Sequence, residues 1–196
     1  MRDYEIRAAL RSELRALHAG DADALIIEEL GLCTGTARVD VAVINSSITG
    51  YEIKSDQDTL SRLPGQIEVY SRALDYVTVV ACPAHVEKIV RLVPAWFGIT
   101  EAEAGGAAVT LQRVRAGRKN ASVEPYALVQ LLWRDEALSL LREFGLERGV
   151  KSKPRAAILR RLAGARSVEE LGRRVRHQLR SRADWRTSGQ AAGSQV

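Results

Sequence analysis

The sequence contains few of the residues that build disulfide-stapled or zinc-binding proteins. Its 196 residues include two cysteines, Cys33 and Cys82, and three histidines, which are too few and too scattered for a disulfide framework or a Cys/His zinc site. No apolar run approaches the roughly 20 residues of a membrane span, and the charged N-terminus lacks the apolar segment of a signal peptide. We therefore expect a cytoplasmic protein whose two thiols are buried.

The motifs of several common enzyme classes are also missing. There is no Gly-x-Ser-x-Gly elbow, no glycine-rich phosphate loop before a Lys-Ser/Thr pair, and no dinucleotide-binding fingerprint. No internal repeat of solenoid length is present. With 46% hydrophobic and 27% charged residues, the composition is that of an ordinary globular protein, and the chain is long enough to bury a substantial core.

The charges are distributed unevenly along the chain. Residues 1–112 contain 10 Lys and Arg against 16 Asp and Glu, a net charge of −6, whereas residues 113–196 contain 19 against 8, a net charge of +11. A basic half of this kind can hold the phosphates of a nucleic acid. It can equally be a solvated helix face, and charge alone does not decide between the two interpretations.

Hydrophobic periodicity predicts a mixed α/β protein. In chain order, the predicted elements of the first part are a helix over 4–18, strands over 24–30, 38–44 and 51–55, a helix over 64–75, a strand over 76–81, a helix over 85–93 and a hairpin around Gly105-Gly106. Turn residues between the second and third strands favour antiparallel pairing. The fourth strand is almost continuously apolar, which favours a central position covered on both faces.

From residue 123 onward the pattern turns helical and arginine-rich. The predicted helices of this part span residues 125–144, 153–162 and 167–182. The end of the chain is small and polar, which is typical of a disordered tail. The predicted organisation is a core at 1–115, a basic helical region at 123–186 and a disordered tail at 187–196.

Two of the predicted apolar strands carry charged side chains. Asp40 lies within the second strand, and Glu52 and Lys54 lie within the third. Because side chains alternate across a strand, Glu52 and Lys54 share one face. Two carboxylates and an ammonium would then converge where the two strands meet, an arrangement that suits a divalent metal and a phosphate. The alternative is a cross-strand charge cluster with a structural role only.

This order of elements, with Asp40 and Glu52-x-Lys54 in these places, resembles the PD-(D/E)XK nuclease superfamily over about residues 1–82. More closely, the chain is similar to a group of small bacterial proteins, often from mobile or phage-linked loci. They share the pattern Arg-Val-Asp, then Gly-Tyr/Phe-Glu-Ile-Lys-Ser-Asp, then Asp-Thr-Leu, Arg-Leu and Gln, which here runs from Arg38 to Gln66. The resemblance implies an α/β restriction-endonuclease-like core followed by a basic helical C-terminal region.

The same resemblance implies a Mg²⁺-dependent nuclease that hydrolyses the phosphodiester bonds of DNA, in DNA processing or in defence against phages and mobile elements. It assigns Asp40 and Glu52 as ligands of Mg²⁺, with Mn²⁺ as a possible substitute, and Lys54 as the cation that steadies the attacking water or the developing phosphate charge. An upstream acid completes such a site, and we favour Glu29 over Glu28; in a strand, only one of the two can face the site. The alternative function is a noncatalytic nucleic-acid-binding or partner-binding protein that keeps the fold.

Further candidate residues lie on the helix after Lys54 and in the basic half. Gln66 and Tyr70 are four apart and therefore share a helix face. This spacing resembles the element that follows the catalytic strand in RecB-type nucleases, which implies that Gln66 borders the site and Tyr70 contacts nucleic acid, although Tyr70 can equally be a core residue. Arginine and lysine suit phosphate contacts that add affinity without reading sequence. The candidate DNA contacts of this kind are Lys151, Lys153, Arg155, Arg160 and Arg161.

Overall fold

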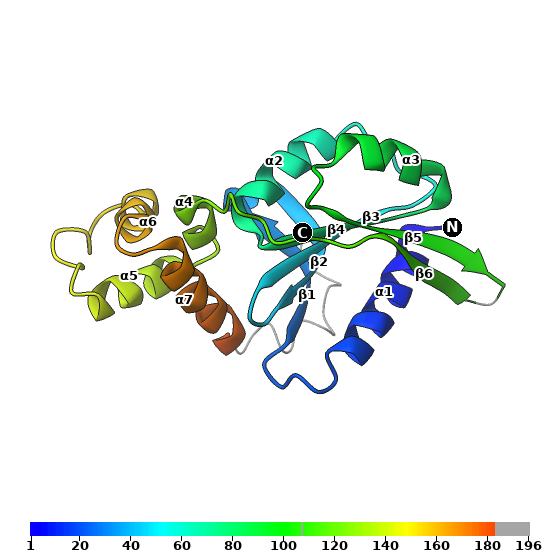
Figure 1. The fold of residues 1–196 in the computed structure, drawn as a ribbon. Helices are drawn as coiled ribbons and strands as arrows, with labels where there is room; N and C mark the ends of the chain where they lie inside the picture. Colours follow the sequence, from blue (N-terminus) through cyan, green and yellow to red (C-terminus); the bar gives the residue numbers. More distant parts are fainter. Residues whose placement is uncertain (107, 183–196) are drawn as a thin grey trace, which may run out of the picture.

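A computed structural model describes residues 1–106 and 108–182 of the chain. In this part a six-stranded mixed sheet is combined with seven α-helices, so the predicted α/β class is confirmed (Figure 1). The predicted tail at 187–196 and the last residues of the predicted helical region lie outside the described residues. None of the described helices combines the length and the apolar character needed to cross a membrane.

The elements follow the predicted order along the chain. The strands are β1 (Leu25–Leu32), β2 (Ala37–Ile44), β3 (Ile48–Lys54), β4 (Tyr76–Ala81), β5 (Gly98–Gly105) and β6 (Ala108–Arg115). The helices are α1 (Asp3–Leu17), α2 (Leu63–Ala73), α3 (Pro83–Leu92), α4 (Pro125–Val129), α5 (Arg134–Glu143), α6 (Arg155–Ala163) and α7 (Val168–Ser181), and a short 3₁₀ turn, η1 (Cys33–Gly35), links β1 to β2.

The spatial order of the strands in the sheet is the same as their order in the chain. β1, β2 and β3 pair antiparallel, β3, β4 and β5 pair parallel, and β6 returns antiparallel to β5. The two parallel connections run through α2 and α3, which lie on one face of the sheet, while α1 covers the other face (Figure 1). The predicted antiparallel pairing of β2 with β3 and the central position of β4 are both confirmed.

Each face of the sheet has its own hydrophobic cluster. α1 turns Ile6, Leu10 and Leu14 toward one face, because these residues recur at helical spacing. β4 contributes to both clusters, since adjacent Val79 and Val80 are buried on opposite faces. This explains why β4 is apolar almost throughout, whereas a strand with one solvated face would alternate.

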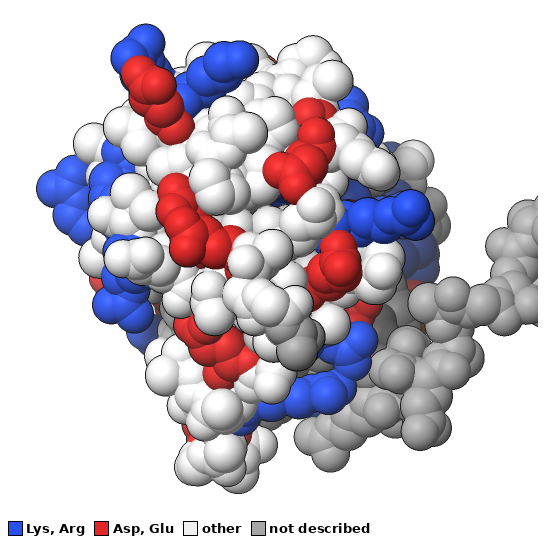
Figure 2. Space-filling model, turned by 90° about the vertical axis from the view of Figure 1, so that its right-hand side faces the viewer, with Lys and Arg blue, Asp and Glu red and all other residues white. Residues whose placement is uncertain are grey.

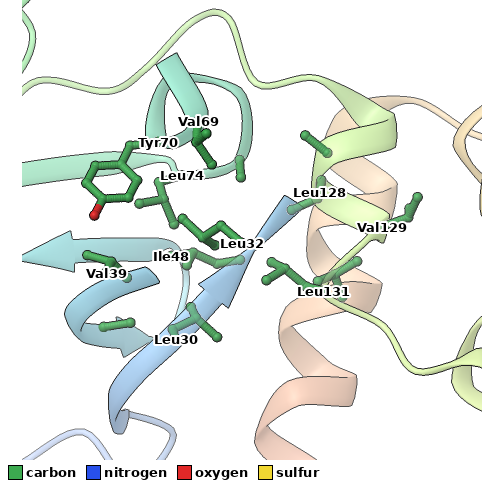
Figure 3. Packing of buried hydrophobic residues seen from close by; sticks show 14 of the residues in the cluster. Leu30, Leu32, Val39, Ile48, Val69, Tyr70, Leu74, Leu128, Val129 and Leu131 are labelled. Carbon is green, nitrogen blue, oxygen red and sulfur yellow. The ribbon is translucent and has the colours of Figure 1, made fainter. Parts of the chain in front are cut away.

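The cluster on the α2 side continues into the C-terminal helices. Figure 3 shows Leu32 of β1 and Leu74, which follows α2, on the same side of the sheet as Leu128 of α4 and Leu131, and all four belong to one buried cluster. The predicted boundary between residues 115 and 123 therefore does not divide the hydrophobic core. The division into a core at 1–115 and a basic helical region at 123–186 stays a prediction.

The predicted helix over 125–144 is interrupted and forms two helices, α4 and α5. The backbone N–H of Trp133 donates to the carboxylate of Glu136 over 2.7 Å, which starts α5 at a new angle. Glu136 is buried and also accepts two hydrogen bonds from Arg182, which follows α7. The interruption was not visible in the sequence, because Leu131 and Leu132 continue the apolar spacing and the partner that fixes Glu136 lies 46 residues away.

The close packing around Gly50 of β3 gives a stability prediction. A Cβ at this position would lie 2.6 Å from Cδ1 of Leu74 and 3.0 Å from Cγ2 of Val39, and both are core side chains (Figure 3). We expect Gly50→Ala to lower the free energy of unfolding by about 1–3 kcal/mol in a urea titration, because overpacking forces the core apart. Gly65→Ala is the control, since no atom lies within 4 Å of its Cβ. Equal effects of the two substitutions would contradict the prediction.

Candidate functional site

The first two strands change their buried face at Glu29 and Asp40. In β1, Ile27 and Leu30 both pack into the cluster on the α2 side, although three residues of regular strand would place them on opposite faces. The same shift occurs in β2 on either side of Asp40, which the pairing register places opposite Glu29. Glu29 has a φ of 57°, in the left-handed region that non-glycine residues seldom adopt. The candidate site is therefore built where two strands swap faces together.

This change of face directs two consecutive glutamates toward α1. Glu28 pairs with Arg11 at 2.5 Å, and Glu29 pairs with Arg7 at 3.2 Å, one turn earlier on the helix. Both glutamates thus point toward α1, because the strand does not alternate regularly at this position, but they pair with different arginines. Arg7 also contacts Asp40, so Glu29 is the glutamate that shares a partner with Asp40.

Asp40 is held by α1 and by β3. Nη2 of Arg7 donates to Oδ1 of Asp40 over 2.9 Å, and the backbone N–H of Ile53 donates to Oδ2 over 2.7 Å. The backbone pairing of β2 with β3 begins only at Val41. The Asp40 carboxylate therefore accepts the backbone N–H of Ile53 beyond the point where the two strands pair through their backbones. Burial raises the pKa of the Asp40 carboxyl, although the hydrogen bond from Ile53 and the charge of Arg7 oppose this shift.

Glu52 faces the opposite side, toward α2. Its Oε1 accepts hydrogen bonds from Nζ of Lys54 and from Nε2 of Gln66, each over 2.7 Å, and its Oε2 accepts one from the hydroxyl of Tyr70 over 2.5 Å. Glu52, Lys54 and Tyr70 are buried. Burial raises the pKa of Glu52 and the charge of Asp40 raises it further, whereas the interactions with Lys54 and Tyr70 oppose the shift. Burial and the charge of Glu52 also raise the pKa of Tyr70, which keeps its hydroxyl a donor.

These contacts do not fit the predicted Mg²⁺ site. Both carboxylate oxygens of Asp40 and both of Glu52 already accept hydrogen bonds from protein donors, and the Arg7 guanidinium pairs with both Asp40 and Glu29. Mg²⁺ binding requires free carboxylate oxygens together with waters in an octahedron. Across the described ranges, no three side chains of His, Cys, Asp or Glu are grouped so that they could hold a metal ion. Binding of Mg²⁺ or Mn²⁺ stays a prediction that this arrangement does not support.

The residues predicted from the α2 helix lie close to Glu52. Gln66 borders Glu52 and Lys54 through direct hydrogen bonds, which is the position expected for it. Tyr70 has no exposed surface, and its hydroxyl also lies 2.9 Å from the backbone carbonyl of Arg38. Contact between Tyr70 and a nucleic acid would require the ring to leave the core, so its observed contacts are those of the core residue that was the alternative.

The five predicted basic contacts lie in α6 and the segment before it, away from the acidic network (Figure 1). Lys151, Lys153 and Arg160 are exposed. Arg155 instead donates to the carbonyls of residues 130 and 132, and Arg161 donates to the carbonyl of residue 146. The structure thus does not bring the basic candidates and the acidic candidates into one site.

Sequence reasoning missed Arg7, the residue that connects the acids. Its only sequence signal is the spacing of Arg7 and Arg11, one turn apart on a helix whose apolar residues are buried. That spacing indicates two cations on one helix face. It does not indicate their partners, because these lie on strands more than 15 residues away in the chain.

The Arg7–Asp40 contact gives a prediction that a double-mutant cycle can test. Removing either partner leaves a partly buried charge, so Arg7→Met and Asp40→Asn should each destabilise the protein, and the double variant should lose less than the sum of the two. We expect a coupling energy of about 1–3 kcal/mol from urea unfolding. The control cycle uses the exposed Arg91–Glu87 pair, for which we expect less than about 0.5 kcal/mol. Equal coupling in the two cycles would count against a special role for Arg7.

The raised pKa of Glu52 predicts how stability depends on pH. The folded protein retains the Glu52 proton at pH values where the unfolded chain, with a pKa of about 4.3, has released it. This contribution to stability is therefore complete below about pH 4 and is lost as the pH rises through the folded pKa. Relative to wild type, Glu52→Gln should become steadily more stable between pH 4 and pH 8, as measured by urea midpoints. A constant difference across this range would show that the pKa of Glu52 is unshifted.

The comparisons with known proteins place the chain in a phage protein family. The family model described as bacteriophage P4 protein cII matches residues 1–189, nearly the whole chain. Protein cII of Enterobacteria phage P4 is 29% identical over 125 residues, which are 64% of this chain and 47% of that protein. The chain thus spans about half the length of this curated relative. No solved structure matches the chain.

These findings correct the assignment made from the sequence. The matching family and the relative are both phage P4 cII proteins, and neither points to a PD-(D/E)XK nuclease. The predicted superfamily membership, the Mg²⁺-dependent nuclease and hydrolase activity and the role in DNA processing or defence that depended on it are therefore wrong. The charged residues that suggested the resemblance lie on neighbouring strands. The carboxylates of Asp40 and Glu52 face opposite sides, however, and each accepts hydrogen bonds from its own protein donors. The chain belongs to the family of bacteriophage P4 protein cII.

Proposed function

We propose that this protein is a noncatalytic DNA-binding protein that contacts the phosphate backbone through its C-terminal helices. The proposal combines two features of the molecule. The acidic network in the sheet is saturated by its own donors, which suits a structural role, and the positive charge of the chain is concentrated in another part. The observation that carries the proposal is the way in which the acids of that part are paired.

Nearly all acids of the C-terminal part are paired within the protein. Of the seven Asp and Glu between residues 113 and 182, six form ion pairs, and Glu169 is the exception in the described part of the chain. The exposed cations without a carboxylate partner there include Arg148, Lys151, Lys153 and Arg160. The positive surplus is therefore carried by side chains that face solvent and hold no internal anion, which is what contact with a polyanion requires.

The opposite side of the molecule has a different charge pattern. Figure 2 shows the side on which β5 and β6 lie, and there acidic and basic side chains are interspersed. A surface of mixed sign gives little net attraction to DNA. The contrast supports the helical side as the DNA-binding side.

This proposal predicts a salt-dependent affinity that three substitutions weaken. Neutralising Lys151, Lys153 and Arg160 together, each by substitution with Gln, should weaken binding to a labelled DNA by about 10- to 100-fold at 50 mM salt. The slope of log K against log salt should fall by about 2–3 at the same time, because each lost phosphate contact removes about one counterion. Fluorescence anisotropy between 50 and 200 mM salt measures both quantities.

The control for this experiment removes the same charge elsewhere. Arg15, Lys88 and Arg113 are exposed residues of α1, α3 and β6, and their triple Gln variant should bind almost as wild type does. Equal losses in the two triple variants would mean that net charge and not this surface binds DNA, and no binding by wild type would refute the proposal. The DNA should be recovered at full length after incubation with Mg²⁺, and cleavage that copurifies with the protein would refute the noncatalytic part.

A further inference from the structure

A cleft of about 790 Å³ lies between α7 and the end of the sheet formed by the β2–β3 turn. Ser46 and Ser47 of that turn contribute hydroxyl groups to its lining. Arg173 and Arg176 of α7 and Lys119, which follows β6, contribute cations. None of these residues belongs to the acidic network or to the α6 surface described above. The cleft joins segments that are far apart in the sequence.

Arg176 is the most enclosed cation of the cleft and is poorly partnered. Its side chain is 15% exposed, and its nearest acid, Asp75, lies at 3.6 Å, beyond a direct hydrogen bond. The same Asp75 oxygen accepts a hydrogen bond from the backbone N–H of Ile48 over 2.8 Å. Within residues 1–106 and 108–182, no hydrogen bond is formed by the Arg176 guanidinium. Its N–H donors therefore remain available to a ligand in the cleft.

Gly172 provides the space in which this guanidinium lies. A Cβ at Gly172 would lie 2.9 Å from Nη1 of Arg176. Gly172 is buried in the interior of α7, where glycine costs about 1 kcal/mol of helix stability relative to alanine. The sequence thus has the less stable residue at a position where an added Cβ would push against the Arg176 guanidinium.

The charges around Arg176 favour a bound anion. Burial lowers the pKa of Arg176; Asp75 opposes this shift, and the nearby charges of Arg180 and Arg173 add to it. Arg180 is held close by, donating to the backbone carbonyl of Asn45 over 3.1 Å. The charges of Arg173 and Arg180 therefore repel that of Arg176, whose nearest carboxylate is Asp75, and an anion beside them would relieve that repulsion.

We propose that this cleft holds a backbone phosphate of the bound DNA, with the Arg176 guanidinium as its bidentate donor. Lys119 and Arg173 add charge at the rim, and the hydroxyls of Ser46 and Ser47 add neutral donors. The planar fork of arginine matches two phosphate oxygens, and charge-assisted bonds of this kind are stronger than neutral ones. This inference rests on the proposed DNA binding and names one point at which the backbone is fixed.

Three substitutions test the cleft by DNA anisotropy with the full chain. Arg176→Gln removes the donor, and Gly172→Ala displaces it while favouring the helix, so each should weaken binding by about tenfold and lower the salt slope by about 1. Glu169→Gln removes an exposed acid from the lining of the cleft, and it should tighten binding about two- to fivefold because it removes a repulsion. Arg113→Gln, on exposed β6, is the matched control and should bind as wild type does.

The combination of outcomes separates this inference from the proposed function. Weaker binding by Gly172→Ala together with unchanged or increased thermal stability, and tighter binding by Glu169→Gln, supports the cleft, because damage to the fold produces neither result. Wild-type affinity in Arg176→Gln or Gly172→Ala, or no tightening in Glu169→Gln, overturns it even if the Lys151/Lys153/Arg160 variant is weak. Failure of wild type to bind DNA overturns both proposals.

Discussion

The guanidinium of Arg7 is the interaction on which the arrangement of the sheet depends. It pairs with Asp40 and Glu29 at the position where β1 and β2 exchange their buried faces, and it also pairs with Asp3 on its own helix. Without this cation, the partly buried carboxylate of Asp40 would lose its charged partner, and the exposed Glu29 would keep only its longer contact with Arg38 at 3.7 Å. α1 therefore does more than cover one face of the sheet. Its Arg7 neutralises the two carboxylates that lie where β1 and β2 change their buried faces.

The backbone pairing of β2 with β3 stops at Val41, and this determines which donors Asp40 and Glu52 contact. The carboxylate of Asp40 accepts the backbone N–H of Ile53, so Asp40 acts as a strand partner, while Glu52 points toward α2 and meets Lys54. A buried ion pair of this kind contributes little net stability unless its remaining donors and acceptors are satisfied. Here Gln66 and Tyr70 satisfy them, and such closed networks favour one packing arrangement over others. The geometry therefore favours a structural interpretation of these charges.

The sequence predicted the parts of the molecule that depend on local periodicity. The strand pair that carries Asp40 and Glu52 and the helix that carries Gln66 follow from spacings of two and of 3.6 residues. The contact between Gln66 and Glu52 agrees with that expectation, whereas Asp40 and Glu52 face opposite sides. The left-handed backbone at Glu29 could not be predicted, because a glutamate carries no preference for it. The sequence also could not show that the carboxylate oxygens already accept hydrogen bonds, because Arg7 lies 33 residues from Asp40 in the chain. The same pattern of acids can mark an open site or a closed network, and only the donors around them distinguish the two.

The division of charge between the two halves has a physical consequence at their junction. In the sheet, Asp40 and Glu28 are paired with arginines of α1, and Glu52 is paired with Lys54. In the helices, the acids are paired with one set of arginines, and a second set remains without anions. Asp75 lies directly before β4 and is the acid nearest to Arg176, which belongs to that second set. The Asp75 oxygen already accepts a hydrogen bond from the backbone N–H of Ile48. The cleft at this junction therefore combines enclosed donors with an unbalanced positive charge, whereas the outer surface of α6 offers positive charge without enclosure. A backbone phosphate in the cleft would therefore be held by geometry as well as by charge, whereas contacts on α6 would depend on charge alone.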